Sequence, residues 1–278
     1  VVVGLDEPPT MLEALASQLA RLRADGWEVL LVSSGAVAAG KSVAGEAVAA
    51  MRNPVTVKQV LAAAGQVRLM ETWQNAFRQH GLQTAQLLLS KADFQSREHY
   101  LNTRACVEGT LEAGLVPVIN ENDVVAVTEL MFTDNDELAG MLAGMIDAQV
   151  LALLSSVEGV HDPSSGATIG QWDDTQHSIE SVVRSGTSQL GRGGMHSKLS
   201  VARRTASLGT DVTIADGRVN DVLCRLAAGE AIGTHFPASN RVPPAKRWLA
   251  SMDDQALGVV VINDGARDAL LDRNRLTS

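Results

Sequence analysis

Apolar residues along the chain alternate between two spacings, and this alternation predicts the order of the elements. Between residues 10 and 25 apolar side chains recur every three or four positions, which predicts a helix that ends at Gly26. Other segments are short continuous apolar runs, which are typical of buried strands. The predicted helices are one that begins at Ala36 and others at 56–80, 97–113, 135–148, 195–208 and 219–228. The predicted strands are at 28–32, 84–89, 115–119, 150–154 and 211–214.

These strands lie between helices and are apolar along their length, which indicates an α/β protein with a parallel sheet covered on both faces. Polar residues follow three of the strands directly, at 33–34, 120–123 and 155–156. The carboxyl ends of parallel strands share one edge of a sheet, and ligands of open α/β sheets bind at that edge. We therefore expect the functional site to be built from these three segments.

The pattern of residue types along the chain changes near residue 237, which predicts a domain boundary. We expect residues 1–237 to form one domain, and residues 238–278 to be a linker and the beginning of a second domain whose remainder is absent. In this second part strands are predicted at 246–250 and 258–262, and a helix at 265–271. At the other end, residues 1–3 resemble a shortened strand that runs abruptly into a helix, so we expect a segment to be missing near Gly4.

Composition narrows the class of protein. The 278 residues are 45% hydrophobic and 20% charged, which is typical of a globular protein and excludes intrinsic disorder. The net charge of −9 argues against general nucleic-acid binding. Two cysteines cannot form a disulfide framework or a cysteine-based zinc site. Because the sequence has neither a long uninterrupted apolar run nor a secretory leader, we expect a cytoplasmic protein without a membrane span.

Two motifs follow predicted strands and carry candidate chemistry. In VSSGAVAAG at 32–40, Ser34 and Gly35 join a strand to a helix, where glycine lets a ligand approach and the helix start offers N–H groups to an anion. A serine-capped turn is the simpler interpretation of this motif. In the run 120–123, Asp123 could bind an ammonium group and the amides could bind a carboxylate, although an Asx-rich turn has the same composition.

Two further motifs open helices. Residues 133–137, TDNDE, place acidic side chains in a first helical turn, which by itself stabilises a helix. Residues 191–198, GRGGMHSK, place three glycines ahead of Lys198, an arrangement that suits phosphate binding by backbone amides and one point charge. The spacing matches neither a P-loop nor a G-x-G-x-x-G fingerprint. We expect a glycine-rich loop here that leads into the helix.

Taken in order, these motifs resemble the glutamate 5-kinase family of the amino-acid kinase superfamily, over about residues 1–237. The segments that carry the resemblance are VSSGAVAAG at 32–40, AGQ at 64–66, YLNTR at 100–104, VINEND at 118–123, FTDND at 132–136, and GGM at 193–195 with Lys198. The resemblance implies an αβα sandwich on a mainly parallel sheet. It also implies that ATP, with Mg²⁺, phosphorylates the side-chain carboxylate of L-glutamate, giving an acyl phosphate on the route to proline. The tail is similar to the start of a PUA domain.

The resemblance also implies roles for individual residues. L-glutamate would be bound by Ser34, Gly35, Asn120, Asp123 and Asn135, with Asp123 on its ammonium group and Asn135 on a carboxylate. Lys198 would stabilise charge on the transferred phosphoryl group, and Asp136 would orient the catalytic lysines. ATP would contact Ser155, Ser156, Arg192, Gly193, Gly194, Met195 and Lys198. No metal-ligating side chain is assigned, and feedback inhibition by L-proline and a homo-oligomer are expected.

Three positions depart from the family's pattern. No lysine follows the first strand, Ser155 and Ser156 stand where many members have Thr-Asp or Ser-Asp, and His161 stands where a tyrosine is usual. Two alternatives stay open. One is another enzyme of the same fold, of the acetylglutamate-, aspartate- or isopentenyl-phosphate-kinase type, although VINEND with DND favours glutamate. The other is a kinase-fold module that senses glutamate or proline without turnover.

Overall fold

The computed structural model of the chain describes residues 2–3, 9–125, 132, 134–185, 189–239 and 241–250, together with residues 265 and 267. Within these residues seven strands form one sheet in the order β3-β4-β2-β1-β5-β6-β7. All neighbours pair in parallel except β6 and β7. The strands are β1 (Val2–Val3), β2 (Leu31–Ser33), β3 (Thr84–Leu89), β4 (Val116–Glu121), β5 (Val150–Ser155), β6 (Asp211–Asp216) and β7 (Thr234–Phe236).

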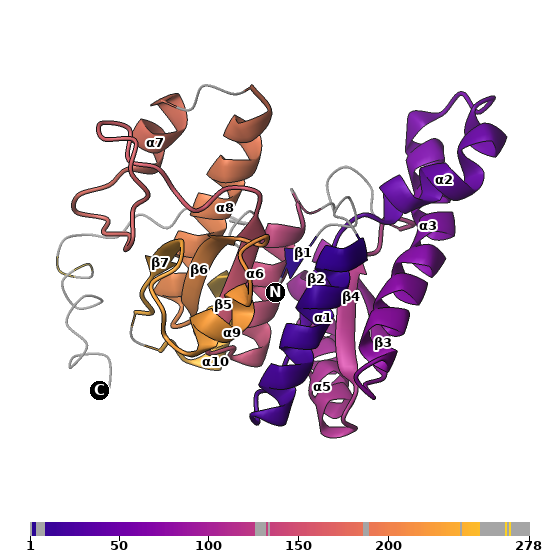
Figure 1. The fold of residues 1–278 in the computed structure, drawn as a ribbon, viewed down its shortest axis with the longest axis horizontal. Helices are drawn as coiled ribbons and strands as arrows, with labels where there is room; N and C mark the ends of the chain where they lie inside the picture. Colours follow the sequence, from indigo (N-terminus) through magenta and orange to yellow (C-terminus); the bar gives the residue numbers. More distant parts are fainter. Residues whose placement is uncertain are drawn as a thin grey trace.

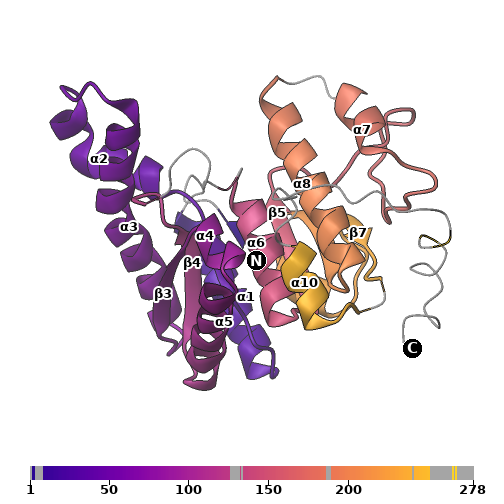
Figure 2. The ribbon, with the colours of Figure 1, turned by 180° about the vertical axis from the view of Figure 1, so that it is seen from behind.

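Helices cover both faces of the sheet (Figures 1 and 2). They are α1 (Pro9–Ala24), α2 (Ala36–Val48), α3 (Pro54–Arg78), α4 (Lys91–Gln95), α5 (Arg97–Glu112), α6 (Asn135–Ile146), α7 (Ile179–Ser185), α8 (Gln189–Ser207), α9 (Val222–Ala227) and α10 (Pro244–Ala250). One buried apolar cluster joins the sheet to α1, α3 and α9, and a second joins it to α5, α6 and α8. Each of these helices has a buried apolar side, so the α/β class and the αβα layering are confirmed.

The ends of two predicted strands are set by their neighbours rather than by hydropathy. The strand predicted at 28–32 begins only at Leu31, because that is where β2 first pairs with β4. The strand predicted at 115–119 continues through Asn120 to Glu121, because β3 pairs with it as far as Leu89 opposite Glu121. The polar run therefore does not simply follow β4, since its first two residues belong to the strand.

Two expectations for the second half of the chain are wrong. The glycine-rich stretch predicted as a loop lies inside α8, which begins at Gln189, six residues before the predicted start. Glycine costs a helix about 1 kcal/mol relative to alanine and so weakens a helix without forbidding it. The strand predicted at 246–250 is helix α10, which starts at Pro244, a residue well suited to a first helical position. The strand predicted at 258–262 and most of the helix predicted at 265–271 lie outside the described residues.

Helix α10 packs back on the body of the fold. Arg247 is buried and pairs with Asp147, which caps the end of α6. Trp248 donates a hydrogen bond from Nε1 to the carbonyl oxygen of Phe94 on α4 over 3.0 Å, and its ring lies under the guanidinium of Arg97. The proposed boundary at residue 237 therefore has a helix beyond it that rests on α4 and α6.

A cavity of about 950 Å³ lies at the amino-terminal edge of the sheet. Its walls include Val29 and Leu30 before β2 and Val150 and Leu151 at the start of β5. This edge is opposite the polar strand ends, so the cavity is separate from the candidate site. Among the described helices, none is both long and apolar enough to cross a membrane.

Candidate active site

The first predicted segment of the site, Ser34 and Gly35, lies at a sharp turn between β2 and α2. Gly35 has φ 109°, a left-handed conformation that glycine adopts without strain, and it directly precedes the helix. Ser33 is fully buried and accepts a hydrogen bond from Nε1 of Trp73 over 2.8 Å. The turn is thus anchored on one side by the sheet and on the other by a tryptophan of α3.

Close packing of α2 on α3 fixes this turn further. A Cβ atom on Gly65 would lie 1.7 Å from the carbonyl oxygen of Ala36, and one on Gly40 would lie 1.9 Å from that of Leu61. Only glycine allows these backbones to approach so closely. In Figure 1, α2 and α3 stand on one side of the molecule and α7 and α8 on the other, with the carboxyl ends of the strands between them.

Two asparagines that were predicted to bind substrate lie within hydrogen-bonding distance of each other. Nδ2 of Asn135, at the start of α6, donates to Oδ1 of Asn120 over 3.1 Å. Asn120 is only 3% exposed, and its own Nδ2 donates to Oε1 of Gln66 over 3.0 Å. The motifs VINEND and FTDND are therefore joined by a side-chain bond, and α3 contributes a third amide.

The start of α6 is held by a well-formed cap. Asp134 precedes the helix in an extended conformation and accepts a hydrogen bond from the backbone N–H of Glu137 over 3.0 Å. This cap places Asn135 and Asp136 in the first helical turn. One residue later, Glu137 forms an ion pair of 2.9 Å with Lys91 at the start of α4.

Asp136, which is buried, forms an ion pair with Lys198, which is partly buried. Nζ of Lys198 lies 2.8 Å from each carboxylate oxygen of Asp136 and 3.3 Å from the carbonyl oxygen of Leu154. The side chains are 8% and 16% exposed for Asp136 and Lys198. Burial raises the pKa of Asp136 above its ordinary value, and the nearby Lys198 opposes that rise. A cation and a carboxylate from distant elements thus meet at the end of β5.

The two acidic residues of VINEND have different partners. Asp123 pairs with Lys58 of α3 over 2.9 Å. Glu121 is half-buried and accepts a hydrogen bond from the backbone N–H of Phe132 over 2.9 Å. Burial raises the pKa of Glu121, and the hydrogen bond from Phe132 partly opposes this. Glu121 thereby connects the end of β4 to the approach of α6.

On the far side of Lys198, Ser155 and Ser156 lie beside the end of β6. The backbone N–H of Gly217 donates to the carbonyl oxygen of Ser155 over 2.9 Å, and Arg218 donates to the carbonyl oxygen of Ser156. Arg218 also pairs with Asp216 over 2.7 Å, and hydrogen bonding by Arg218 lowers the pKa of that carboxyl. Arg218 therefore lies beside Ser156, the position at which the sequence has serine instead of the family's usual aspartate.

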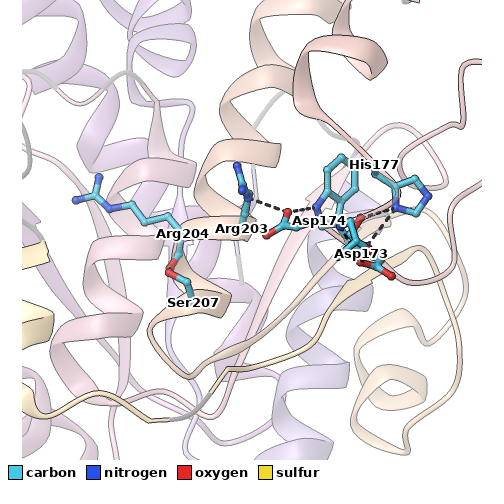
Figure 3. Close-up of polar contacts among 8 residues, drawn as sticks. Asp173, Asp174, His177, Arg203, Arg204 and Ser207 are labelled. Carbon is cyan, nitrogen blue, oxygen red and sulfur yellow. Dashed lines mark hydrogen bonds and ion pairs between the residues drawn. The ribbon is translucent and has the colours of Figure 1, made fainter. Parts of the chain in front are cut away.

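The residues predicted to touch ATP on α8 are less fully described. Arg192 and Gly193 lie in the helix, and the surroundings of these two residues are outside the described part. Gly194 is exposed, whereas Met195 is partly buried and packs on the apolar cluster around α6. Further along α8, Figure 3 shows Arg203 directed toward Asp174 and His177 directed toward Asp173. The pair of Arg203 and Asp174 joins the segment after β5 to the second half of α8, whereas the contact of His177 with Asp173 lies within that segment.

Several residues of this edge had no assigned role. The sequence motif AGQ includes Gln66, whereas no motif of the sequence indicates Lys58, Lys91 or Arg218. Lys58 lies one helical turn after Pro54, the first residue of α3, and Arg218 follows β6, so position after a strand could have indicated Arg218. Ser90 with Asp93 is a capping box, which could have predicted α4 and thereby Lys91. Among the described residues, no three His, Cys, Asp or Glu side chains are grouped to hold a metal ion.

Comparisons with known proteins identify the family and the fold of the chain. Residues 2–216 match the model of the amino acid kinase family. A glutamate 5-kinase from Chlorobaculum tepidum is 43% identical over 272 residues, which cover 97% of this chain and 75% of that protein. A carbamate kinase from Giardia lamblia has a TM-score of 0.61 at 14% identity, over 86% of this chain and 97% of its own.

A second solved structure has the same fold. It is an N-acetylglutamate synthase from Neisseria gonorrhoeae, with a TM-score of 0.61 at 17% identity. The match covers 86% of this chain and 59% of the synthase chain. At these identities the two likenesses concern the fold alone.

Proposed function

The chain belongs to the amino acid kinase family, among the glutamate 5-kinases, and we propose which of its side chains bind the two substrates and which stabilise the transferred phosphoryl group. The activity is ATP-dependent phosphorylation of the side-chain carboxylate of L-glutamate, the first step of proline biosynthesis. The product is glutamyl 5-phosphate. The assignments below concern which residues of this chain bind, orient and stabilise the reacting groups.

Glutamate is assigned to the side of the sheet edge formed by β2, β4 and the start of α6. Ser34 and Gly35 would face the substrate from the turn after β2, and Asp123 would bind its ammonium group. Asn120 and Asn135 would bind a carboxylate. Support comes from the hydrogen bond between the two amides and from the burial of Asn120, which fixes the pair in one arrangement.

ATP is assigned to the side formed by β5, β6 and α8. Ser155, Ser156 and the α8 residues Arg192, Gly193, Gly194 and Met195 would contact the nucleotide. A divalent cation, proposed to be Mg²⁺, would be carried by the phosphates, because Mg²⁺ keeps several waters and uses few protein ligands. When bound, it neutralises phosphate charge. Lys198 would supply the positive charge contributed by this chain.

The reaction needs positioning and charge neutralisation rather than a strong base. A carboxylate oxygen of glutamate forms a bond to the γ-phosphorus as the bond from that phosphorus to the bridging oxygen breaks, and ADP leaves. The nucleophile is already ionised, so no proton has to be removed. Holding two anions together and stabilising the transferred group therefore carry the catalysis.

The observation that carries the proposal is the ion pair between Lys198 and Asp136. In this pair a partly buried lysine lies 2.8 Å from a buried aspartate, between the two proposed half-sites. Asn135, adjacent to Asp136, belongs to the glutamate side, and Lys198 reaches across from the ATP side. Asp136 thus orients the cation that would meet the phosphoryl group in transit.

A hydroxamate assay across candidate acceptors tests the function. Acyl phosphates react with hydroxylamine, so the assay reports which carboxylate is phosphorylated. We expect signal with L-glutamate and ATP, and at most a small fraction of it with N-acetylglutamate or aspartate. Signal confined to another acceptor would replace glutamate by that substrate, and no signal with any acceptor, despite measurable glutamate binding, would favour a sensing module.

We further propose inhibition by L-proline, a cytoplasmic location and a homo-oligomeric state. Proline shares with glutamate a carboxylate and an amine, the two groups assigned to Asn135 and Asp123. Inhibition should therefore be competitive with glutamate. The rate at low glutamate, measured with and without millimolar proline, tests this, and an unchanged rate would contradict it.

A further inference from the structure

Gln66 of α3 is buried at the candidate site, yet half of its amide has no partner. The residue is 8% exposed, and its Oε1 accepts a hydrogen bond from Nδ2 of Asn120 over 3.0 Å. Among the described residues, its Nε2 has no hydrogen-bond partner. Buried donors are nearly always paired in native proteins, so an unpaired one calls for a reason. Within the described structure, Asn120 is the hydrogen-bond partner of the Gln66 side-chain amide.

The direction of this amide chain is fixed by a backbone group. The N–H of Glu121 donates to Oδ1 of Asn120 over 2.9 Å, and a backbone N–H cannot act as an acceptor. Asn120 therefore presents its oxygen toward Glu121 and Asn135, and its NH₂ group toward Gln66. The oxygen of Gln66 must face Asn120 in turn, which leaves the NH₂ group of Gln66 unpaired.

The backbone of Gln66 is fixed as closely as its side chain. The preceding residue, Gly65, packs so tightly on α2 that a Cβ there would lie 1.7 Å from the carbonyl oxygen of Ala36. The side chain of Gln66 therefore extends from a closely packed turn of α3, and its oxygen accepts a hydrogen bond from Asn120. It holds the Asn120 amide from the side opposite to Asn135.

We propose that Gln66 is a positioning residue for the amino-acid substrate, acting through Asn120 on Asn135. The proposal rests on the assignment of Asn120 and Asn135 to glutamate binding. With its amide fixed, Asn120 accepts one N–H of Asn135. Asn135 then presents its own oxygen and its second N–H in one orientation. The oxygen can accept a hydrogen bond from the ammonium group of an α-amino acid, and the N–H can donate one to a carboxylate.

The test is a glutamine-to-methionine change, which keeps the length of the side chain and removes both polar atoms. Gln66→Met should raise the KM for glutamate about tenfold, the equivalent of one lost hydrogen bond, and leave the KM for ATP within twofold. Gln18→Met is the matched control. Gln18 of α1 is 4% exposed and accepts a hydrogen bond from the backbone N–H of Leu223. It is therefore also a buried, hydrogen-bonded glutamine, but it is not assigned to the candidate site. Its replacement should lower Tm without changing either KM.

A double-mutant cycle separates positioning from a merely structural role. In an Asn135→Ala background the relay has lost its last member, so Gln66→Met should change the KM for glutamate by a smaller factor than it does in the parent. If the two substitutions raised the KM for glutamate independently, their effects would multiply in the double variant, and this result would overturn the proposal. An unchanged KM for glutamate in Gln66→Met would also overturn it. A parent enzyme that does not use glutamate in the hydroxamate assay would instead refute the proposed function, so the two failures are distinguishable.

Discussion

Nζ of Lys58 lies 2.9 Å from a carboxylate oxygen of Asp123, the residue proposed to bind the ammonium group of the substrate. Asp123 is largely enclosed, with 11% of its side chain exposed, whereas Lys58 is 42% exposed. The lysine ammonium therefore occupies the same carboxylate that a substrate ammonium would require. Either the two cations share the carboxylate, or Lys58 moves aside when glutamate binds.

Replacing Asp123 should weaken glutamate binding selectively. Asp123→Asn removes the charge and keeps the shape, and the loss of one charge-assisted hydrogen bond costs about 1.5–3 kcal/mol. The KM for glutamate should rise by about 10- to 150-fold, and the KM for ATP should change by less than threefold. Steady-state kinetics with each substrate varied in turn measures both values.

Lys58→Gln is the control for this prediction. If Asp123 acts on the substrate, removing its competitor should leave the KM for glutamate unchanged or lower it. If Asp123 serves only to bind Lys58, the two variants should behave alike. A matching rise of the KM for glutamate in Lys58→Gln would contradict the assignment of Asp123.

Gly65 should tolerate no side chain. In Gly65→Ala the new methyl group would meet the carbonyl oxygen of Ala36, the first residue of α2, so the two helices must separate. Overpacking of this kind costs roughly 1–3 kcal/mol or more. We expect a lower free energy of unfolding together with a higher KM for glutamate, since Gly35 and Gln66 both depend on this contact. Urea unfolding and kinetics test the two effects.

Gly109→Ala is the matched change elsewhere. Gly109 is exposed on α5, and a Cβ there would have no neighbour within 4 Å. Alanine in a helix is favoured over glycine by about 0.5–1 kcal/mol, so this variant should be slightly more stable and kinetically unchanged. Equal stability of the two variants would show that the α2–α3 contact is not as tight as described.

The sequence was sufficient to predict those site residues that lie at the ends of strands, but not those that reach the site from a helix. Ser34, Asn120 and Ser155 lie at or beside strand ends, and period and polarity were sufficient to place them at one edge. Gln66 and Lys58 reach the same edge from a helix, and the partner of Gln66 is 54 residues away in sequence. Hydropathy records that α3 is amphipathic, but it does not record which strand end its polar side covers.

The segments that were predicted wrongly share a different cause. Glycine content indicated a loop at 191–194, but glycine permits a loop and does not require one. The apolar residues near 246–250 indicated a strand, but the conformation follows from the prolines before them and from the burial of Arg247 against Asp147. Tertiary contacts support α10, and a single sequence carries little information about such contacts.

Glu121 should make the stability of the protein depend on pH. Burial raises the pKa of Glu121 in the folded state above its unfolded value. Its favourable contribution is therefore complete below the unfolded pKa and is lost as pH rises through the folded pKa. Glu121→Gln removes this titration and keeps an oxygen to accept the N–H of Phe132. The variant should gain stability relative to the parent between pH 4 and pH 7, as measured by urea unfolding.

The gain should be small, because Glu121 is only half-buried and water screens part of the effect. Glu98→Gln on the exposed surface of α5 is the control for the substitution itself. A stability difference between Glu121→Gln and the parent that stays constant across the range would contradict the assigned cause.

Replacing Lys198 tests whether this lysine is a catalytic cation or a structural one. In a dissociative transition state negative charge spreads over the phosphoryl oxygens, and a cation held there acts more strongly on the transition state than on the ground state. Lys198→Ala should reduce kcat by about 10²–10³, or roughly 2.7–4 kcal/mol, with little change in the KM for glutamate. Lys198→Arg should recover little, because a planar guanidinium does not replace a compact ammonium group.

Stability measurements distinguish this effect from a loss of fold. Without Lys198, Asp136 stays buried with no described cation beside it, and its pKa, already raised by burial, should rise further. A raised pKa gives stability that is present at low pH and lost as pH rises, so Lys198→Ala should be destabilised less at pH 5 than at pH 8. Lys246→Ala, an exposed lysine on α10, should leave both stability and kcat unchanged. A folded Lys198→Ala enzyme with kcat within threefold of the parent would assign the lysine a purely structural role, as the partner of Asp136.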